Sequence, residues 1–89
     1  MSPRYTVDLR PVVRKQLDRI TAKDRARILR RLAALADDPR PAGVTALAGA
    51  DDLWRVRVGD YRIIYTIDGD RLVVTVVRVA HRREAYRDL

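Results

Sequence analysis

The sequence lacks cysteine and contains one histidine and one serine, and these scarcities exclude several reaction classes. Without cysteine there is no disulfide and no thiol nucleophile, and one histidine cannot supply the three or four ligands of a structural zinc site. The serine is Ser2, beside the N-terminus, where a serine-nucleophile triad has no place to form. We therefore expect a fold without metal or cofactor, suited to a reducing compartment such as the cytoplasm.

Long apolar segments and glycine-rich loops are missing as well. The longest run without a charged residue is 41–50, far shorter than the roughly 20 apolar residues that span a bilayer, and no signal-peptide pattern precedes it. The four glycines are isolated, which excludes a Walker loop and a dinucleotide-binding fingerprint. We expect no membrane partner.

What the chain does have is positive charge. Its 89 residues predict one small domain, 1–89, with a net charge of +7 that favours polyanionic partners. Arginine supplies 17 of the 19 basic residues, which is typical of a coding bias. The positions of the arginines therefore carry more information than their number.

The first half of the chain has mainly helical periodicity. Residues 5–9 alternate as a short strand, and apolar residues spaced three to four apart predict a helix from Pro11 to Ile20. Thr21 and Asp24 resemble a capping box that opens a second helix, which we expect to end around 37–39. Two consecutive helices predict a helical hairpin, and 39–52 is interpreted as an ordered loop.

The second half alternates with a period of two. Residues 53–58 and 61–67 flank a Gly59-Asp60 turn and predict a hairpin, and 72–79 predict an interior strand. Residues 81–89 are interpreted as a short last helix. The fold class is α+β in the order β-α-α-β-β-β-α, with an antiparallel sheet packed on the helical hairpin and a short C-terminal helix.

The predicted hairpin places three arginines on one face. A two-residue turn pairs Arg57 with Arg62 and puts Arg55 on the same side, whereas residues 54, 56, 58, 61, 63, 65 and 67 face the helices. Like charges directly across strands oppose folding, but converging guanidinium groups suit a phosphate. The alternative is a set of solvated arginines paired with Asp60 or a C-terminal carboxylate.

The tail adds His81, Arg82 and Tyr86, of which the last two are four residues apart and so share one side of a helical turn. Each also has a structural interpretation: His81 as the end of a strand, Arg82 as a solvated residue and Tyr86 as a packing residue.

Two stretches carry a family resemblance. The segment 53–65, LWRVRVGDYRIIY, followed by 78–86, RVAHRREAY, resembles the RelE branch of the RelE/ParE superfamily of type II toxins. The resemblance covers nearly the whole chain. It implies a ribosome-dependent mRNA endonuclease that cuts in the A site, needs no cofactor and is held inactive by an acidic, RelB-like antitoxin. It also implies a toxin–antitoxin complex that binds operator DNA through the antitoxin.

The resemblance also implies roles for individual residues. Arg55 and Arg57 match paired basic residues that bind substrate, whereas Arg62, Arg82 and Tyr86 match catalytic positions. Some relatives have lysine at the paired positions, and arginine cannot accept a proton as a lysine can once deprotonated. Proton transfer would then fall to Tyr86 or to His81, whose ordinary pKa suits it.

Two other classes of function remain open from the sequence. A ParE-like toxin has the same fold but inhibits DNA gyrase by binding, which needs no catalytic set. A non-enzymatic RNA- or DNA-binding domain would bind phosphates in a salt-dependent way without cutting the strand.

Overall fold

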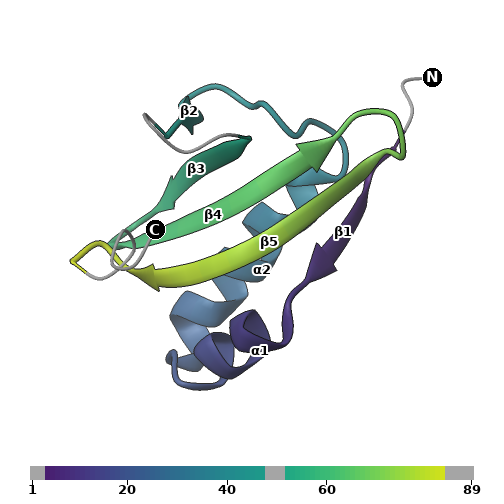
Figure 1. The fold of residues 1–89 in the computed structure, drawn as a ribbon. Coiled ribbons are helices and arrows are strands. Elements are labelled where there is room, and N and C mark those ends of the chain that lie inside the picture. Colours follow the sequence, from purple (N-terminus) through teal and green to yellow (C-terminus); the bar gives the residue numbers. More distant parts are fainter. Residues whose placement is uncertain (1–3, 48–51, 84–89) are drawn as a thin grey trace.

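The computed structural model describes residues 4–47 and 52–83. Within these residues, two helices and five strands follow one another (Figure 1). They are β1 (Thr6–Leu9), α1 (Pro11–Asp18), α2 (Ala22–Leu35), β2 (Thr45–Ala46), β3 (Leu53–Val58), β4 (Tyr61–Asp68) and β5 (Val73–His81). The predicted α+β class is confirmed. None of the helices in these described stretches is long and apolar enough to cross a bilayer.

The strands form one sheet in the order β1-β5-β4-β3-β2. The pairings β3·β4 and β4·β5 are antiparallel, as predicted, and the short β2 also pairs antiparallel with β3. In contrast, β1 runs parallel to β5, from Thr6 beside Val73 to Leu9 beside Val76. The predicted antiparallel sheet therefore has one parallel pairing, at this edge. Alternation in the sequence predicts on which face of the sheet a side chain lies, but it does not predict the direction of the neighbouring strand. The predicted interior position of the last strand is confirmed, because β5 lies between β1 and β4.

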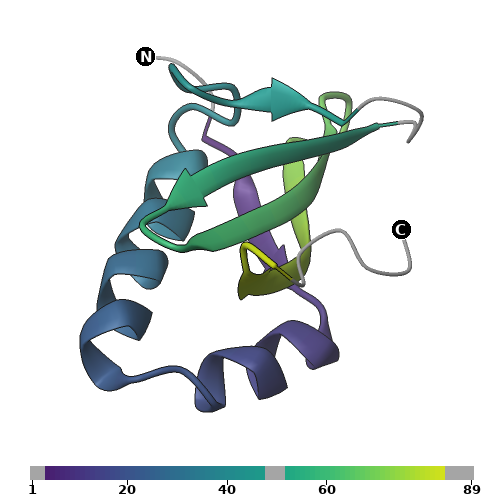
Figure 2. The ribbon, with the colours of Figure 1, turned by 90° about the vertical axis from the view of Figure 1, so that its left-hand side faces the viewer.

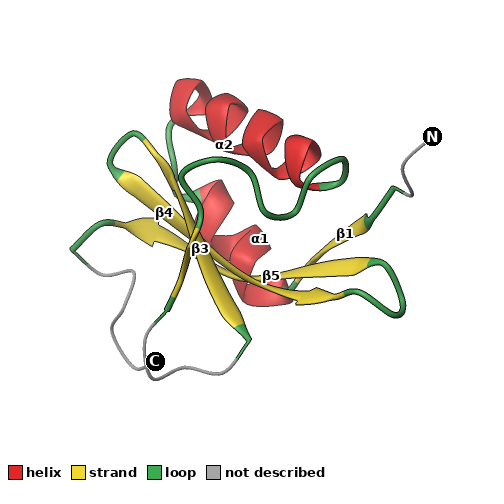
Figure 3. Cartoon of the chain, turned by 90° about the horizontal axis from the view of Figure 1, so that it is seen from above, coloured by secondary structure: helices red, strands yellow, loops and turns green. Residues whose placement is uncertain are grey.

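Both helices cover the same face of the sheet, and Figures 2 and 3 show how they diverge from the turn that joins them. Pro11 begins α1, and the hydroxyl of Thr21 accepts a hydrogen bond of 3.4 Å from the Asp24 N–H at the start of α2. Both helices end earlier than predicted, at Asp18 and Leu35. Ile20, beyond the end of α1, is still buried, which explains why it fits the apolar spacing of that helix.

The register of the β3–β4 hairpin is the predicted one. Val58 lies beside Tyr61, Arg57 beside Arg62, and Trp54 beside Tyr65. The face of the hairpin that carries Val56, Ile63 and Tyr65 packs into a core completed by both helices and by β5. A short strand, β2, lies in the segment predicted to be a loop; with only two residues it has no alternation to detect.

The segment before β2 is tied to the sheet by two aromatic side chains. The buried Tyr65 hydroxyl donates a hydrogen bond of 2.7 Å to the Pro39 carbonyl, and the Arg40 guanidinium lies 5.0 Å from the Trp54 ring centre. Burial raises the pKa of Tyr65 from 10.0 to about 12. These contacts fix the path of the chain that leads to Gly43 and Thr45.

A bulge shifts the alternation of β5. Tyr65 pairs with Val76 and Ile64 with Arg78, so Val77 has no partner in β4. Without the extra residue, Arg78 would share the helix-covered face with Val74 and Val76, where an unpaired charge is costly. With it, Val79 enters the core and Arg78 lies on the opposite face.

The end of β5 differs from the predicted last helix. His81 is the last strand residue and pairs with Tyr61, and Arg82 and Arg83 form a turn. The continuation to Leu89 lies outside the described residues.

Candidate functional site

Among the described residues, four arginines share the sheet face that is turned away from the helices, which we call the arginine face. Cross-strand partners place them in two rows, Thr45–Arg55–Ile64–Arg78 and Arg57–Arg62–Ala80. The predicted trio of Arg55, Arg57 and Arg62 is thus brought together. Arg78, which the sequence analysis left unassigned, joins them because of the bulge in β5.

The trio lines a cavity of about 160 Å³, the arginine cavity, together with Gly43 and Thr45. The two additional residues come from the segment that Tyr65 ties to the sheet. Sequence reasoning missed them because a loop residue carries no periodic signal of the face it will approach. None of the five lining residues is acidic, so this cavity is electrostatically suited to an anion.

Two arginines of the cavity are held by backbone carbonyl groups. The Arg57 Nε donates to the Gly59 carbonyl at 3.2 Å, and the Arg62 Nη1 donates to the Tyr61 carbonyl at 3.3 Å. Neither forms an ion pair within the described part of the chain. Arg62 is half-buried and Arg57 is exposed, so a phosphate can reach both without the breaking of a salt bridge.

Ile64 supports this face from within. It is fully buried although it points away from the helical layer, and it lies between Arg55 and Arg78 in the cross-strand row. An apolar residue at this position gives the arginine stems a surface to pack on while the guanidinium groups stay at the rim.

His81 lies on the other face of the sheet. Its ring meets the Tyr61 ring edge-on, with centroids 5.9 Å apart and planes at 81°, and its Nδ1 accepts a bond of 3.4 Å from the Arg83 N–H. It lines a separate cavity of about 300 Å³ with Gln16, Arg19 and Ile20, among others. The structure therefore does not bring His81 into the arginine cavity.

Arg82 and Tyr86 complete the predicted set. The Arg82 N–H donates to the Asp60 carbonyl at 2.7 Å, which places its main chain beside the β3–β4 turn, at the same end of the sheet as Arg57 and Arg62. Its side chain is exposed. Tyr86 lies outside the described residues, so its relation to Arg82 stays a prediction.

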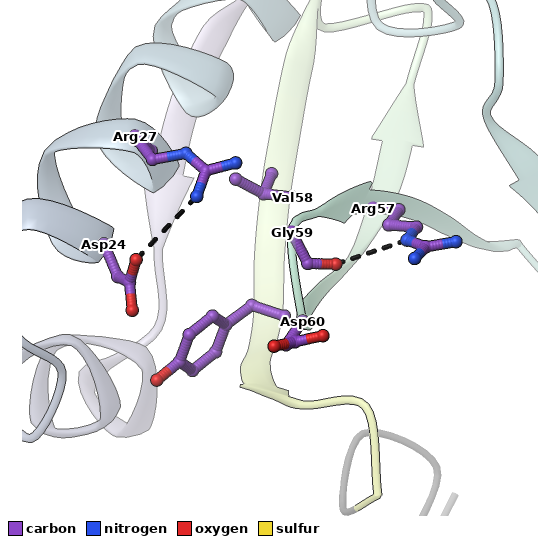
Figure 4. A pocket seen from close by; sticks show the side chains of 7 residues that line it. Asp24, Arg27, Arg57, Val58, Gly59 and Asp60 are labelled. Atoms are coloured by element: carbon purple, nitrogen blue, oxygen red, sulfur yellow. Dashed lines mark hydrogen bonds and ion pairs between the residues drawn. The ribbon is translucent and has the colours of Figure 1, made fainter.

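A second polar cavity, the hairpin-tip cavity, lies between α2 and the β3–β4 turn (Figure 4). Its volume is about 220 Å³, and its lining residues are Asp24, Arg27, Arg57, Val58, Gly59, Asp60 and Tyr61. The Arg27 guanidinium packs so closely on Gly59 that a Cβ atom there would lie 3.3 Å from Nη1. Residues 4–47 and 52–83 contain no group of three or more histidine, cysteine or acidic side chains able to hold a metal ion.

Comparison with known proteins places this chain in a family. A family model described as the ParE toxin of type II toxin–antitoxin systems, parDE, matches residues 7–86. The chain belongs to the RelE/ParE superfamily of type II toxins.

Solved structures place this toxin near the RelE branch. The archaeal RelE–RelB complex from Pyrococcus horikoshii OT3 is similar at 30% identity and a TM-score of 0.79, covering 91% of this chain and 98% of that one. The RelBE2 toxin–antitoxin complex from Mycobacterium tuberculosis is similar at 26% identity and a TM-score of 0.78, with 89% and 99% covered. The intact RelBE complex from E. coli, at 22% identity, a TM-score of 0.75 and 86% and 95% covered, shares the fold. The chain is thus a RelE-like toxin of a toxin–antitoxin system.

Proposed function

We propose that this toxin is a metal-independent mRNA endonuclease that cuts A-site codons on the ribosome. The observation that carries the proposal is the arginine cavity, in which Arg55, Arg57 and Arg62 converge without a carboxylate among the lining residues. A cavity of this composition favours the phosphodiester of an RNA chain and the extra negative charge that develops on it during cleavage.

The chemistry needs no nucleophile from the protein. A base removes the proton from a 2′-hydroxyl, the 2′-oxygen attacks the adjacent phosphorus, and the bond to the 5′-oxygen breaks. The products are a 2′,3′-cyclic phosphate and a 5′-hydroxyl that has received a proton from an acid. Arg57 and Arg62 hold the non-bridging oxygens, and Arg55 and Arg82 add positive charge around the pentacovalent phosphate.

Proton transfer falls to a residue other than arginine, because a guanidinium keeps its protons at any physiological pH. His81 and Tyr86 are the two candidates from the sequence. The position of His81 on the helix-covered face, against Tyr61, favours Tyr86 for the step at the phosphate. Tyr86→Phe is therefore expected to slow cleavage more than His81→Gln.

The proposed partner is an acidic, RelB-like antitoxin. Support comes from the solved relatives in complex with RelB and from the net charge of +7. Antitoxin carboxylates would cover the arginine face, and the complex would bind operator DNA through the antitoxin. The affinity of the toxin for the antitoxin is expected to fall with rising salt and with charge reversal at Arg57. A complex whose affinity changes with neither contradicts the electrostatic part of this proposal.

DNA gyrase inhibition is a second candidate, favoured by the description of the matching family model as a ParE toxin. Gyrase inhibition by binding would leave the arginine cavity without a catalytic task. A supercoiling assay with purified gyrase separates the two candidates.

The deciding experiment incubates the purified toxin with mRNA on programmed bacterial ribosomes and maps the cut sites. We expect cleavage at the A-site codon with the wild type and a loss of at least about a hundredfold with Arg62→Ala. Arg71→Ala is the matched control, since Arg71 is an exposed arginine in the β4–β5 turn, at the other end of the sheet. Intact mRNA with the wild type contradicts the proposal, and so does undiminished cleavage with Arg62→Ala.

A further inference from the structure

The two cavities near the β3–β4 turn differ in charge. Among the described residues, three arginines and no acidic residue line the arginine cavity, whereas Arg27, Arg57, Asp24 and Asp60 line the hairpin-tip cavity. A phosphate in the hairpin-tip cavity would meet two carboxylates. The balanced walls instead favour an uncharged group that carries both hydrogen-bond donors and acceptors on one edge.

The polar groups of this cavity are open to a ligand. Arg27 and Asp24 form only a long ion pair, 3.8 Å between Nη1 and Oδ1, and their side chains are 48% and 36% exposed. The Asp60 carboxylate, which is exposed, makes no hydrogen bond or ion pair with any residue that the structure describes. Both donors and acceptors therefore line this cavity: Asp24 and Arg27 come from α2 and Asp60 comes from the turn (Figure 4).

The two cavities adjoin at one side chain. Arg57 lines both of them. The strand β2 pairs only with Arg55 and Trp54, so the outer edge of β3 from Val56 to Val58 has no neighbouring strand in the described stretches. A single-stranded nucleic acid whose phosphate lies in the arginine cavity can cross this edge and place the next nucleotide at the hairpin tip.

The hairpin-tip cavity is large enough to admit a small ligand group. Its volume is about 220 Å³. Single-stranded RNA is recognised with an unstacked base inserted between side chains and hydrogen-bonded along its edge.

We propose that the hairpin-tip cavity binds the nucleobase next to the scissile phosphate and that Asp60 and Arg27 read its hydrogen-bonding edge. The inference rests on the proposed function and adds to it a residue pair that determines sequence preference. Asp60 accepts from amino or imino groups of the base, and Arg27 donates to carbonyl or ring-nitrogen acceptors.

The test is the base preference of cleavage. Programmed ribosomes carry A-site codons that vary through all four bases at each position beside the cut, and cleavage rates are measured for the wild type and for Asp60→Asn. Asparagine keeps the shape and replaces one acceptor by a donor, so preference at a single position should shift toward bases that present a carbonyl. The expected change in relative rate is roughly fivefold to a hundredfold, the range for one base contact. Asp70→Asn, the same substitution in the exposed β4–β5 turn, should leave the preference unchanged.

Arg27→Gln provides the complementary measurement. It should alter preference at the same position as Asp60→Asn, with the total rate on the best codon kept within a few-fold, because neither residue belongs to the arginine cavity. An unchanged preference in both variants overturns the base-binding proposal while wild-type cleavage leaves the proposed function intact. Absence of cleavage by the wild type contradicts both the proposed function and the base-binding proposal. A uniform loss of rate at all codons, as a loss of folding or of phosphate binding would give, also overturns the proposal.

Discussion

The two faces of the sheet show how one strand serves two purposes. Ile63 and Arg62 are neighbours in β4, but Ile63 is fully buried under the helices and Arg62 lies in the arginine cavity. The helix-covered face is apolar and continuous with both helices, whereas the opposite face pairs Arg57 directly with Arg62 at a cost to stability. Because side chains alternate along a strand, the core and the candidate site are specified by interleaved positions and need not compete for residues.

The two faces should differ most clearly in how substitutions at Ile63 and Arg62 change the free energy of unfolding. Ile63→Ala leaves a cavity in the core and is expected to lower the free energy of unfolding by about 2–5 kcal/mol. Arg62→Ala should change it by less than about 1 kcal/mol, because relief of the repulsion from Arg57 offsets the lost packing of the side-chain stem. Chemical denaturation of both variants checks this, with cleavage measured in parallel.

Activity should show the opposite order. Arg62→Ala is expected to lose cleavage while folded, and Ile63→Ala to keep cleavage per folded molecule. A large loss of stability in Arg62→Ala would mean that the arginine face is part of the structural core, and the contrast between the faces would not hold.

Tyr65, on the helix-covered face, holds the segment that supplies Gly43 and Thr45 to the arginine cavity. Tyr65→Phe leaves the buried Pro39 carbonyl without its hydrogen-bond donor, which should cost about 1–3 kcal/mol at neutral pH. The control is Tyr5→Phe, a half-buried tyrosine whose hydroxyl donates no hydrogen bond within the described residues.

The pH dependence of stability provides a second readout for Tyr65. Its pKa is about 12 in the folded protein and 10.0 ordinarily, so the unfolded chain loses this proton first as the pH rises. The free energy of unfolding of the wild type should therefore fall between pH 10 and 12, by at most about 1.4 kcal/mol per pH unit, and Tyr65→Phe should lack this part of the decrease. Parallel curves for the two proteins would contradict the assignment.

Gly59 is the conformationally constrained residue of the turn between β3 and β4. Its φ of +58° is in the left-handed region, and Arg27 packs against the place of a Cβ. Gly43, with φ +88° and no atom within 4 Å of a Cβ, is a matched control that has the strain without the contact. Gly43→Ala should cost about 1–2 kcal/mol, and Gly59→Ala should cost more.

A double substitution separates strain from contact. In an Arg27→Ala background the excess cost of Gly59→Ala over Gly43→Ala should disappear, because the crowding guanidinium is gone. An excess that persists without Arg27 would show that the turn is constrained by its backbone alone.

Much of this structure was predictable from periodicity. The hairpin register followed from a two-residue turn and alternating apolar residues, and it correctly placed Arg57 beside Arg62. The parallel pairing of β1 with β5 joins segments far apart in the chain, and no local pattern specifies such a pairing. The two-residue β2 was too short to show alternation.

The candidate site was predictable only where it lies on regular strands. Arg55, Arg57 and Arg62 followed from alternation, whereas Arg78 reaches their face through an extra residue that simple alternation does not contain. Gly43 and Thr45 are placed by the contact of a distant tyrosine with Pro39. His81 was grouped with Arg82 by proximity in sequence, but neighbouring residues of a strand point to opposite faces, and His81 is still part of β5.

The smallest expected effect is at the start of α2, the helix that supplies Asp24 and Arg27 to the hairpin-tip cavity. Thr21→Ala removes an exposed capping bond that is already long, 3.4 Å, so the cost should be about 0.5–1 kcal/mol, at the low end for N-caps. Thr21→Ser keeps the hydroxyl and should restore most of the stability, as thermal denaturation would measure. Since the arginine face lies on the other side of the sheet, cleavage of the best codon should be the same in all three proteins. A loss of cleavage in Thr21→Ala alone would show that the helical layer controls the arginine cavity, and the independence of the two faces would then be wrong.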